Sequence, residues 1–392
     1  MKVKDIMEPV LKIVEEEDPE VKQKHIKKPK VQSFKLKKKS KPLVGLDIGS
    51  HTIKVAVGQY KNDKIVVKKL CSIRIAPGAV RDGKLIQKSD TEAAIANLLS
   101  EAGVKNKEFV CAVESNEVVR REMLLPWVDE SDIMGLITYE IGQYLPINPE
   151  SYIIQYKLMD TEAGENGQKM RLMVCAVPKE FVSDYMDVLL DVRLKPYALD
   201  TNTNALEKLL LLKTAQEFRE KNCVFIDMGH NQFHISFFRN GDCLFSKKIG
   251  IGGDMLNHVL LTNLEVSERD AERLKIHNME RISVLELCDE YSNTDGSSGD
   301  LGEMVLKGFV DVINNWVEEI NHVLKYLIRE HASLDDIFLY GGCSFIHDVD
   351  SYFEKKFKVE TKRIEMNNSV AGKVDVTQVP IYLNAICALI RN

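Results

Sequence analysis

The sequence predicts an α/β protein made of two duplicated halves around a cleft, with a small α+β segment inserted in the first half. The main observation is that "LDIG" at residues 46–49 and "IDMG" at 226–229 each end an apolar run with Asp-x-Gly. Each is followed by an alternating strand, a turn and a second strand, and the turns come 16 and 15 residues after the Asp. Because the two copies lie 180 residues apart, the repeat is a whole fold unit and not a short solenoid period.

The composition is that of a globular protein with two or three domains, since the chain has 392 residues and 44% of them are hydrophobic. The sequence has no run of about 18 apolar residues and no apolar N-terminal segment, so we expect no transmembrane helix and a cytoplasmic location. The eight cysteines show no C-x-x-C or metal-binding spacing, which predicts reduced thiols.

The N-terminal tail, residues 1–42, differs in charge from the rest of the chain. Residues 1–41 hold 13 lysines against 7 acidic residues, and residues 22–41 hold ten lysines and no acid. Such a block is usually disordered, and apolar residues at helical spacing predict one short helix within residues 1–20. Two interpretations stay open: a solvated linker, or a segment that contacts anionic lipid headgroups.

The first half should begin with a three-strand meander over residues 43–49, 52–60 and 64–75, followed by a helix at 91–102 and a strand at 108–115. The inserted segment reads as strand, helix, strand, strand. These elements are expected at residues 117–126, 129–145, 151–159 and 171–178. A helix over residues 179–192 then returns the chain to the first half.

The second half should repeat the meander over residues 223–229, 233–238 and 243–253. A charged helix at 267–275 and a flexible loop at 293–302 follow. A long amphipathic helix then carries its apolar residues on one face: Leu306, Phe309, Val310, Ile313, Val317, Ile320, Leu324 and Leu327. A strand ending in a diglycine turn at 335–345 and a C-terminal helix complete the chain.

We expect each half to be built on a five-stranded mixed sheet. The chain then divides into a tail, a first half in three pieces, an insert, and a second half with its own small subdomain. The predicted boundaries are 1–42 for the tail; 43–117, 179–221 and 376–392 for the first half; 118–178 for the insert; 222–255 and 303–375 for the second half; and 256–302 for the small subdomain.

The two Asp-x-Gly turns carry the chemistry that the sequence predicts. Backbone N–H groups at glycine turns can cradle a phosphate, and Asp47 and Asp227 at two strand ends can hold a hydrated Mg²⁺. Ser50 adds a hydroxyl and Lys54 a cation, although the alternating pattern leaves open whether Lys54 faces the cleft or solvent. Further glycine turns at 252–253, before a helix, and at 341–342 favour anion binding.

Histidine and nucleophile patterns predict no second kind of site. The nine histidines have no metal-binding spacing, and His230 and His234 lie in a strand region where we do not expect them to converge. No Ser/His/Asp or Cys/His arrangement can be argued from the sequence.

The motifs "LDIGSHTIK", "IDMG" and "YGGCS" resemble the two phosphate motifs and the adenosine motif of the actin-like ATPase superfamily, over residues 43–392. Within that superfamily the chain resembles most the family of the type IV pilus assembly protein PilM. The resemblance extends to "PGAVRDGKLIQ", "EIGQYLPINPESYIIQYKLM", "GIGGDML" and "LYGGCSFIHDV". The insert resembles the small subdomain, called 1C, of the related cell-division protein FtsA.

The resemblance implies ATP and Mg²⁺ as cofactors, with Asp47 and Asp227 at the metal. Glu272 and Lys275 would lie near the ribose and base, although a charge-rich helix leaves a merely exposed face as the alternative. The implied nucleotide-binding residues are Asp47, Gly49, Ser50, Lys54, Asp227, Gly229, Gly252, Gly253, Glu272, Lys275, Gly341, Gly342 and Cys343. One position departs from the family pattern: Phe233 stands where a Thr is usual six residues after Asp227. We therefore expect ATP binding with weak or no hydrolysis and name no catalytic residue.

The expected function is that of a cytoplasmic ATP-binding scaffold at the inner face of the cell membrane, in a type IV pilus or the related type II secretion machinery. The resemblance implies a PilN-like bitopic partner, whose N-terminal peptide would lie in a groove between the first core and the insert. It also suggests pilus motor components as further partners and an oligomer, and no nucleic acid.

The same residues leave two other functions open. An FtsA-like filament tether would need an amphipathic helix after the core, and the sequence stops at Asn392. A small-molecule kinase of the sugar-kinase type would need a general base in the cleft, for which the sequence offers no additional Asp motif.

Overall fold

The fold is described from a computed structural model for residues 40–106, 108–144, 147–164, 167–291, 300–331 and 333–391. The predicted short helix within residues 1–20 and most of the predicted loop at 293–302 lie outside the described residues. Among the residues that are described, no helix is both long and apolar enough to cross a membrane.

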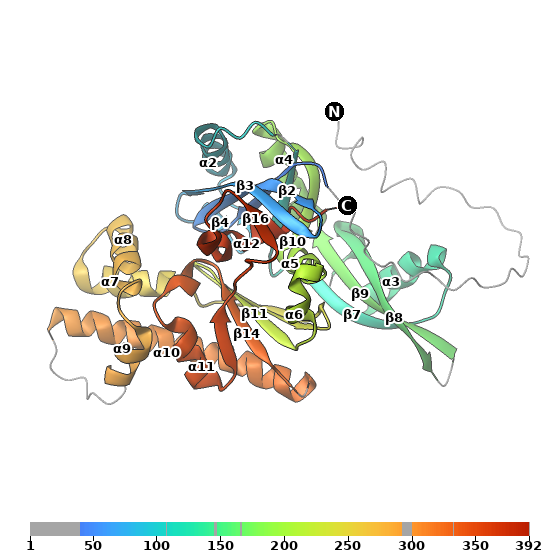
Figure 1. The fold of residues 1–392 in the computed structure, drawn as a ribbon. Helices are drawn as coiled ribbons and strands as arrows, with labels where there is room; N and C mark the ends of the chain where they lie inside the picture. The colour runs from blue at the N-terminus through green and yellow to red at the C-terminus, as the bar shows by residue number, and fades with distance from the viewer. Residues whose placement is uncertain are drawn as a thin grey trace, which may run out of the picture.

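The first half contains a mixed sheet in the order β10-β6-β1-β2-β3-β16 (Figure 1). Its strands are β1 (Leu43–Ile48), β2 (Thr52–Lys61), β3 (Lys64–Arg74), β6 (Glu108–Val113), β10 (Lys195–Thr201) and β16 (Val370–Gly372). The predicted meander is confirmed, because β1 pairs antiparallel with β2 and β2 with β3. The expectation of five strands was wrong for this half. The short β16, from near the C-terminus, joins β3 in parallel as a sixth.

The second half repeats this arrangement in the sheet β13-β12-β11-β14-β15. Its strands are β11 (Cys223–Met228), β12 (Phe233–Arg239), β13 (Asp242–Ile249), β14 (Asp336–Tyr340) and β15 (Glu360–Arg363). In both halves the first strand pairs antiparallel with the next strand and parallel with a later one, β6 or β14. The internal repeat read from the sequence is therefore a repeat of the fold.

Helices cover both faces of the first sheet. Helices α2 (Lys88–Glu101) and α4 (Lys179–Asp191) bury Ile95, Leu98, Phe181 and Tyr185 against its outer face. Helices α5 (Asn202–Leu210), α6 (Gln216–Arg219) and α12 (Val379–Cys387) lie between the two sheets, where one apolar cluster includes residues of both halves. Helix α12 approaches β1 so closely that a Cβ on Gly45 would lie 1.9 Å from the carbonyl oxygen of Ala385. The sheet therefore needs glycine there.

The second half is covered by the long helix α10 (Leu301–His331), which confirms the predicted amphipathic helix. Its buried face includes Phe309, Ile313, Trp316, Ile320 and Leu324. The remaining helices of this half are α7 (Asp254–Leu264), α8 (Glu268–Met279), α9 (Val284–Tyr291) and α11 (Val349–Phe357). Helices α7 and α8 lie above α10 in the view of Figure 1, and α7 packs against α10.

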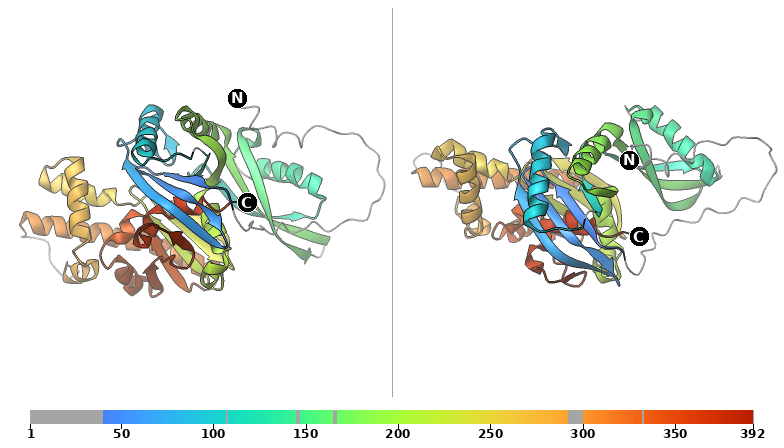
Figure 2. Two further views of the ribbon diagram at one scale, coloured as in Figure 1. Left: turned by 45° about the horizontal axis from the view of Figure 1, so that its top comes forward. Right: turned by 90° about the horizontal axis from the view of Figure 1, so that it is seen from above.

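The inserted segment forms its own layer of strands β7 (Val119–Pro126), β8 (Tyr152–Gly164) and β9 (Gly167–Pro178), in the order β7-β9-β8, with helix α3 (Glu130–Tyr144) on one face. It projects from the side of the molecule opposite α7 and α8 (Figure 2). Its apolar cluster, which includes Leu125, Ile137, Ile141 and Leu172, is separate from the other cores. A separate core is what a subdomain at 118–178 requires, and the boundary itself stays a prediction.

The shorter elements fill the connections. A two-stranded ribbon of β4 (Val80–Arg81) and β5 (Lys84–Leu85) follows the first meander. Single 3₁₀ turns lie at Pro149–Ser151, Lys213–Ala215, Gly342–Phe345 and Val376–Gln378. The third of these turns follows β14, so the predicted diglycine turn leads into a 3₁₀ turn first, and α11 begins only at Val349.

Candidate functional site

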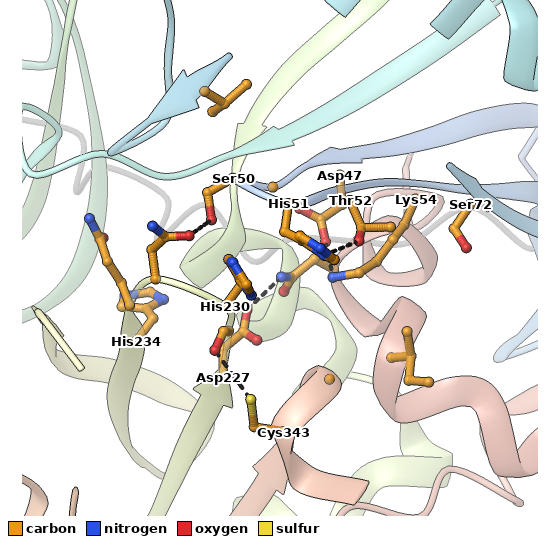
Figure 3. Close-up of a pocket in the computed structure, with 18 of the residues that line it drawn as sticks. Asp47, Ser50, His51, Thr52, Lys54, Ser72, Asp227, His230, His234 and Cys343 are labelled. Carbon is orange, nitrogen blue, oxygen red and sulfur yellow. Dashed lines mark hydrogen bonds and ion pairs between the residues drawn. The ribbon is translucent and has the colours of Figure 1, made fainter. Parts of the chain in front are cut away.

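A cavity of about 860 Å³ lies between the two halves, and the loops after β1 and β11 line it (Figure 3). The structure brings ten of the predicted site residues to its wall: Asp47, Gly49, Ser50, Lys54, Asp227, Gly229, Glu272, Lys275, Gly342 and Cys343. The other three, Gly252, Gly253 and Gly341, lie behind this wall, where they allow close packing.

The first loop places Asp47 at the end of β1, directly opposite Lys54 on β2. The Lys54 Nζ lies 3.4 Å from the Asp47 Oδ2, and both side chains are largely buried. This geometry answers the question that the sequence left open, because Lys54 faces the cleft. Burial opposes the charge on Lys54, but the carboxylates of Asp47 and Asp227 outweigh it and raise the pKa of the ammonium.

The second loop places Asp227 near the end of β11, facing the same space as Asp47 (Figure 3). Burial raises the pKa of Asp227 to about 6, and the charge of Asp47 adds to the rise. Asn384 on α12 donates a hydrogen bond to its Oδ2 at 2.8 Å. Two carboxylates whose charges repel inside one cleft fit a hydrated Mg²⁺, which would relieve that repulsion.

Two glycines pack closely in the wall of the cavity, one against Asp227 and one against Cys343. A Cβ on Gly341 would lie 2.4 Å from the Asp227 Oδ1, and Gly341 has a φ of +86°, which side chains rarely adopt. A Cβ on Gly253 would lie 2.6 Å from the Cys343 Sγ. The diglycine turns therefore let the backbone of one half come close to the carboxylate and to the wall of the cavity.

Two contacts join the two loops directly across the cleft. The Ser50 hydroxyl donates to the Asn231 Oδ1 at 2.8 Å. The imidazoles of His51 and His230 stack with their centroids 4.2 Å apart (Figure 3). Sequence reasoning missed this pair because the histidines lie far apart in the chain. The available signal was the repeat, since His51 follows Asp47 by four residues and His230 follows Asp227 by three.

Helix α8 supplies the predicted pair of Glu272 and Lys275, which are one turn apart and buried. The Lys275 Nζ lies 2.7 Å from the Glu272 Oε2 and also donates to the Gly253 carbonyl at 3.1 Å. Burial would raise the pKa of Glu272, but Lys275 and a hydrogen bond from Asn257 lower it. The pair is therefore part of the cavity wall, and the alternative of an exposed charged face was wrong.

An apolar wall adjoins this pair. Ile276, Met279, Cys343, Phe345 and Ile346 line the same cavity. The thiol of Cys343 donates to the Gly229 carbonyl at 3.4 Å, and burial raises its pKa to about 11, so it stays protonated. A flat heterocyclic ring can pack against such an apolar wall, while the buried polar groups beside it fix the orientation of the ring.

Phe233 does not face the cavity. Its ring is fully buried and packs edge-on against Trp316 on α10 at 5.0 Å, inside the core of the second half. Gln232 and His234, its neighbours along the chain, line the cavity. The Phe233 ring therefore does not enter the cavity, because its side chain points to the other face of the sheet. The expectation of ATP binding with weak or no hydrolysis stays a prediction.

Sequence reasoning also missed the polar end of the cavity beyond Ser50. Asp82, Glu114 and Lys248 line it, and Lys248 lies 3.1 Å from the Asp82 Oδ1. Burial raises the pKa of Glu114, which accepts a hydrogen bond from Thr203. His234 also lines this region, and its Nε2 lies 2.6 Å from the Ser246 hydroxyl.

The duplicated sheets, with one Asp-x-Gly loop from each facing into a common cleft, define a protein with the actin-like ATPase fold. The chain belongs to the family of the type IV pilus assembly protein PilM, whose family model matches residues 45–390.

A solved structure agrees with this assignment. The chain is similar to a structure described as the PilM-PilN type IV pilus biogenesis complex, with a TM-score of 0.71 and 18% identity, over 89% of this chain and 97% of that one. It also aligns with the ethanolamine utilization protein EutJ of Carboxydothermus hydrogenoformans, at 12% identity and a TM-score of 0.49, over 90% and 91% of the two chains. A third structure, MreB5 of Spiroplasma citri bound to ADP, aligns at 12% identity and a TM-score of 0.46, over 88% and 94%.

Proposed function

We propose that this chain is an ATP-binding scaffold of the type IV pilus assembly complex at the inner face of the cell membrane. In this proposal it binds the cytoplasmic N-terminal peptide of a PilN-like bitopic protein, and nucleotide regulates that binding. Membership of the PilM family and similarity to a PilM-PilN complex support the pilus role. The single observation that supports nucleotide binding most is the pair of repeat-related carboxylates, Asp47 and Asp227, facing one cleft with Lys54 between them.

In the proposed site, Asp47 and Asp227 hold the hydrated Mg²⁺, and Lys54 offers its charge to the phosphates. The glycine turns at Gly49 and Gly229 present backbone to the phosphates, with the Ser50 hydroxyl nearby. Glu272 and Lys275 lie at the sugar, and the base packs on the apolar wall beside Cys343. Gly252, Gly253 and Gly341 let the backbone segments around the site pack closely, and Gly342 lines the cavity.

A second, smaller cavity supports the peptide-binding part of the proposal. It measures about 350 Å³ and lies on the insert, along strand β7 and beside the C-terminal part of α3. Its lining mixes apolar and charged side chains: Val119, Arg121, Glu122, Met123, Leu124, Leu125, Glu140, Ile141, Val174 and Ala176. The sequence-based expectation was a groove between the first core and the insert, whereas this one belongs to the insert.

Strand β7 is an edge strand within the described residues, where it pairs with β9 alone. An extended peptide can therefore add to its free edge through backbone hydrogen bonds, while the cavity accepts alternate side chains. Leu124 is 48% exposed on this strand, which offers an apolar anchor for the partner. We place the PilN-like peptide here.

Titration of Mg·ATP into the full chain, followed by calorimetry, tests the nucleotide part. We expect Asp47→Ala to weaken binding at least tenfold, because it removes the carboxylate that holds both the metal and Lys54. The matched control is Asp90→Ala, an exposed carboxylate in the first turn of α2. An Asp47→Ala variant that binds Mg·ATP like the wild type would remove the proposed site.

A further inference from the structure

His51, His230 and Glu272 form a cluster in the cleft, of which the proposed nucleotide site uses Glu272 alone. Each offers one nitrogen or carboxylate oxygen, and these three atoms all lie within 4.8 Å of one another. They come from three elements: the loop between β1 and β2, the loop between β11 and β12, and helix α8. The cluster therefore spans the first half, the second half and its helical subdomain.

The three side chains are of the type that binds a borderline transition-metal ion. Two imidazoles and one carboxylate are ligands that suit Zn²⁺, Co²⁺ or Ni²⁺, whereas Mg²⁺ prefers oxygen ligands alone. Tetrahedral bonds of about 2.1 Å place ligand atoms roughly 3.4 Å apart. The Nδ1 of His230 lies 3.9 Å from the Glu272 Oε2, so the imidazole and the carboxylate group already lie side by side.

The surrounding hydrogen bonds hold the ligands in place. The Nδ1 of His51 lies 3.0 Å from the Thr52 hydroxyl, which orients the ring and leaves its Nε2 available. Asn257 donates to the Glu272 Oε2 at 2.7 Å from the neighbouring helix α7. Partners of this kind fix the orientation of metal ligands in proteins. Lys275 also donates to Oε2, so a cation would bind through the other carboxylate oxygen, Oε1.

We propose that His51, His230 and Glu272 bind one Zn²⁺-class divalent ion, which ties the two halves together across the cleft. The stacked arrangement of the two imidazoles already brings the loops into contact, and the ion would replace this stacking by direct bonds. This site is distinct from the carboxylates of Asp47 and Asp227, and it does not depend on the proposed pilus function.

The test is a titration of the chelator-treated full chain with Co²⁺, followed by its visible absorption spectrum, and with Zn²⁺ in competition. We expect one equivalent of Co²⁺ to bind, and the bound Co²⁺ to show the intense visible absorption bands of an ion with a low coordination number. His51→Gln and His230→Gln should each weaken binding at least roughly tenfold. His277→Gln, an exposed histidine on the same helix α8, is the matched control and should bind as the wild type does.

Asp47→Asn separates this site from the proposed Mg²⁺ site, since it should leave Co²⁺ binding unchanged. Absence of Co²⁺ binding, or binding that both histidine variants keep, overturns the proposal. Equal loss in His277→Gln also overturns it, because it would mean nonspecific surface binding. His51→Gln and His230→Gln are independent tests of the site. Thermal unfolding curves show whether each variant folds, and if one does not, the other decides the outcome.

Discussion

Asp227 shows how the cleft alters a single residue. Its pKa of about 6 results from burial first and from the nearby charge of Asp47 second. Lys54 and Asn384 act in the opposite direction without cancelling the shift. The sequence predicted this carboxylate and its partner Asp47, because both stand at strand ends of a repeat. It could not predict the altered pKa, which depends on how closely the two halves approach.

This shift predicts a pH dependence of stability. Between pH 3.8 and about 6 the folded state keeps a proton on Asp227 that the unfolded state has lost. The free energy of unfolding therefore falls as pH rises through this window, by at most roughly 3 kcal/mol. We expect Asp227→Asn to lose this part of the pH dependence and to be more stable than the wild type above pH 6. Urea unfolding of both proteins from pH 4 to pH 7 measures the free energy of unfolding at each pH. If the two free energies change with pH by the same amount, the raised pKa of Asp227 is contradicted.

Elements with a strong apolar pattern were predictable from the sequence. The two meanders and α10 show alternation or a helical stripe over many residues, which local sequence alone reveals. Strands β15 and β16 were missed because Glu360–Arg363 is polar, Val370–Gly372 is only three residues long, and each strand forms by pairing with a distant segment. His51 and His230 were missed for the same reason, since the repeat brings them together and spacing along the chain does not.

The contact between β1 and α12 predicts a large effect from a small substitution. In Gly45→Ala the new Cβ would lie 1.9 Å from the Ala385 carbonyl oxygen, so the helix must shift. We expect a destabilisation of about 2–3 kcal/mol, as for overpacked cores. Gly135→Ala on α3, where a Cβ meets nothing within 4 Å, is the control and should stabilise by about 0.5–1 kcal/mol. Urea unfolding measures both, and equal stabilities for the two variants would contradict this packing.

At the scale of the whole molecule, one ionic network joins the insert to both halves. Lys157 on β8 donates to the Glu207 carboxylate of α5 at 2.6 Å and to the Asp242 carboxylate of β13 at 2.8 Å. Arg120 on β7 donates to Glu207 at 2.6 Å and to the Cys243 carbonyl at 3.4 Å. Because Glu207 belongs to the first half and Asp242 to the second, a rotation of the halves must move the insert or break these contacts. The network therefore offers a route from the relative rotation of the two halves to β7.

This route gives a testable coupling between nucleotide and partner. If nucleotide sets the angle between the halves, the affinity of β7 for the peptide changes when nucleotide binds. The size of that change is the coupling free energy between the two sites. Lys157→Met removes the cation that contacts both halves and keeps most of the side-chain length. We expect it to leave nucleotide binding intact and to weaken the effect of nucleotide on the peptide. Lys169→Met on the neighbouring strand β9 is the matched control.

The most direct test is the affinity of the labelled N-terminal peptide of a PilN-like bitopic protein, measured by fluorescence anisotropy with and without Mg·ATP. We expect the wild type and Lys169→Met to bind the peptide, and Mg·ATP to change the affinity at least about fivefold in both. In Lys157→Met the peptide affinities with and without Mg·ATP should be nearly equal. No binding at high micromolar peptide, or an affinity in the wild type that Mg·ATP leaves unchanged, would contradict a nucleotide-regulated scaffold.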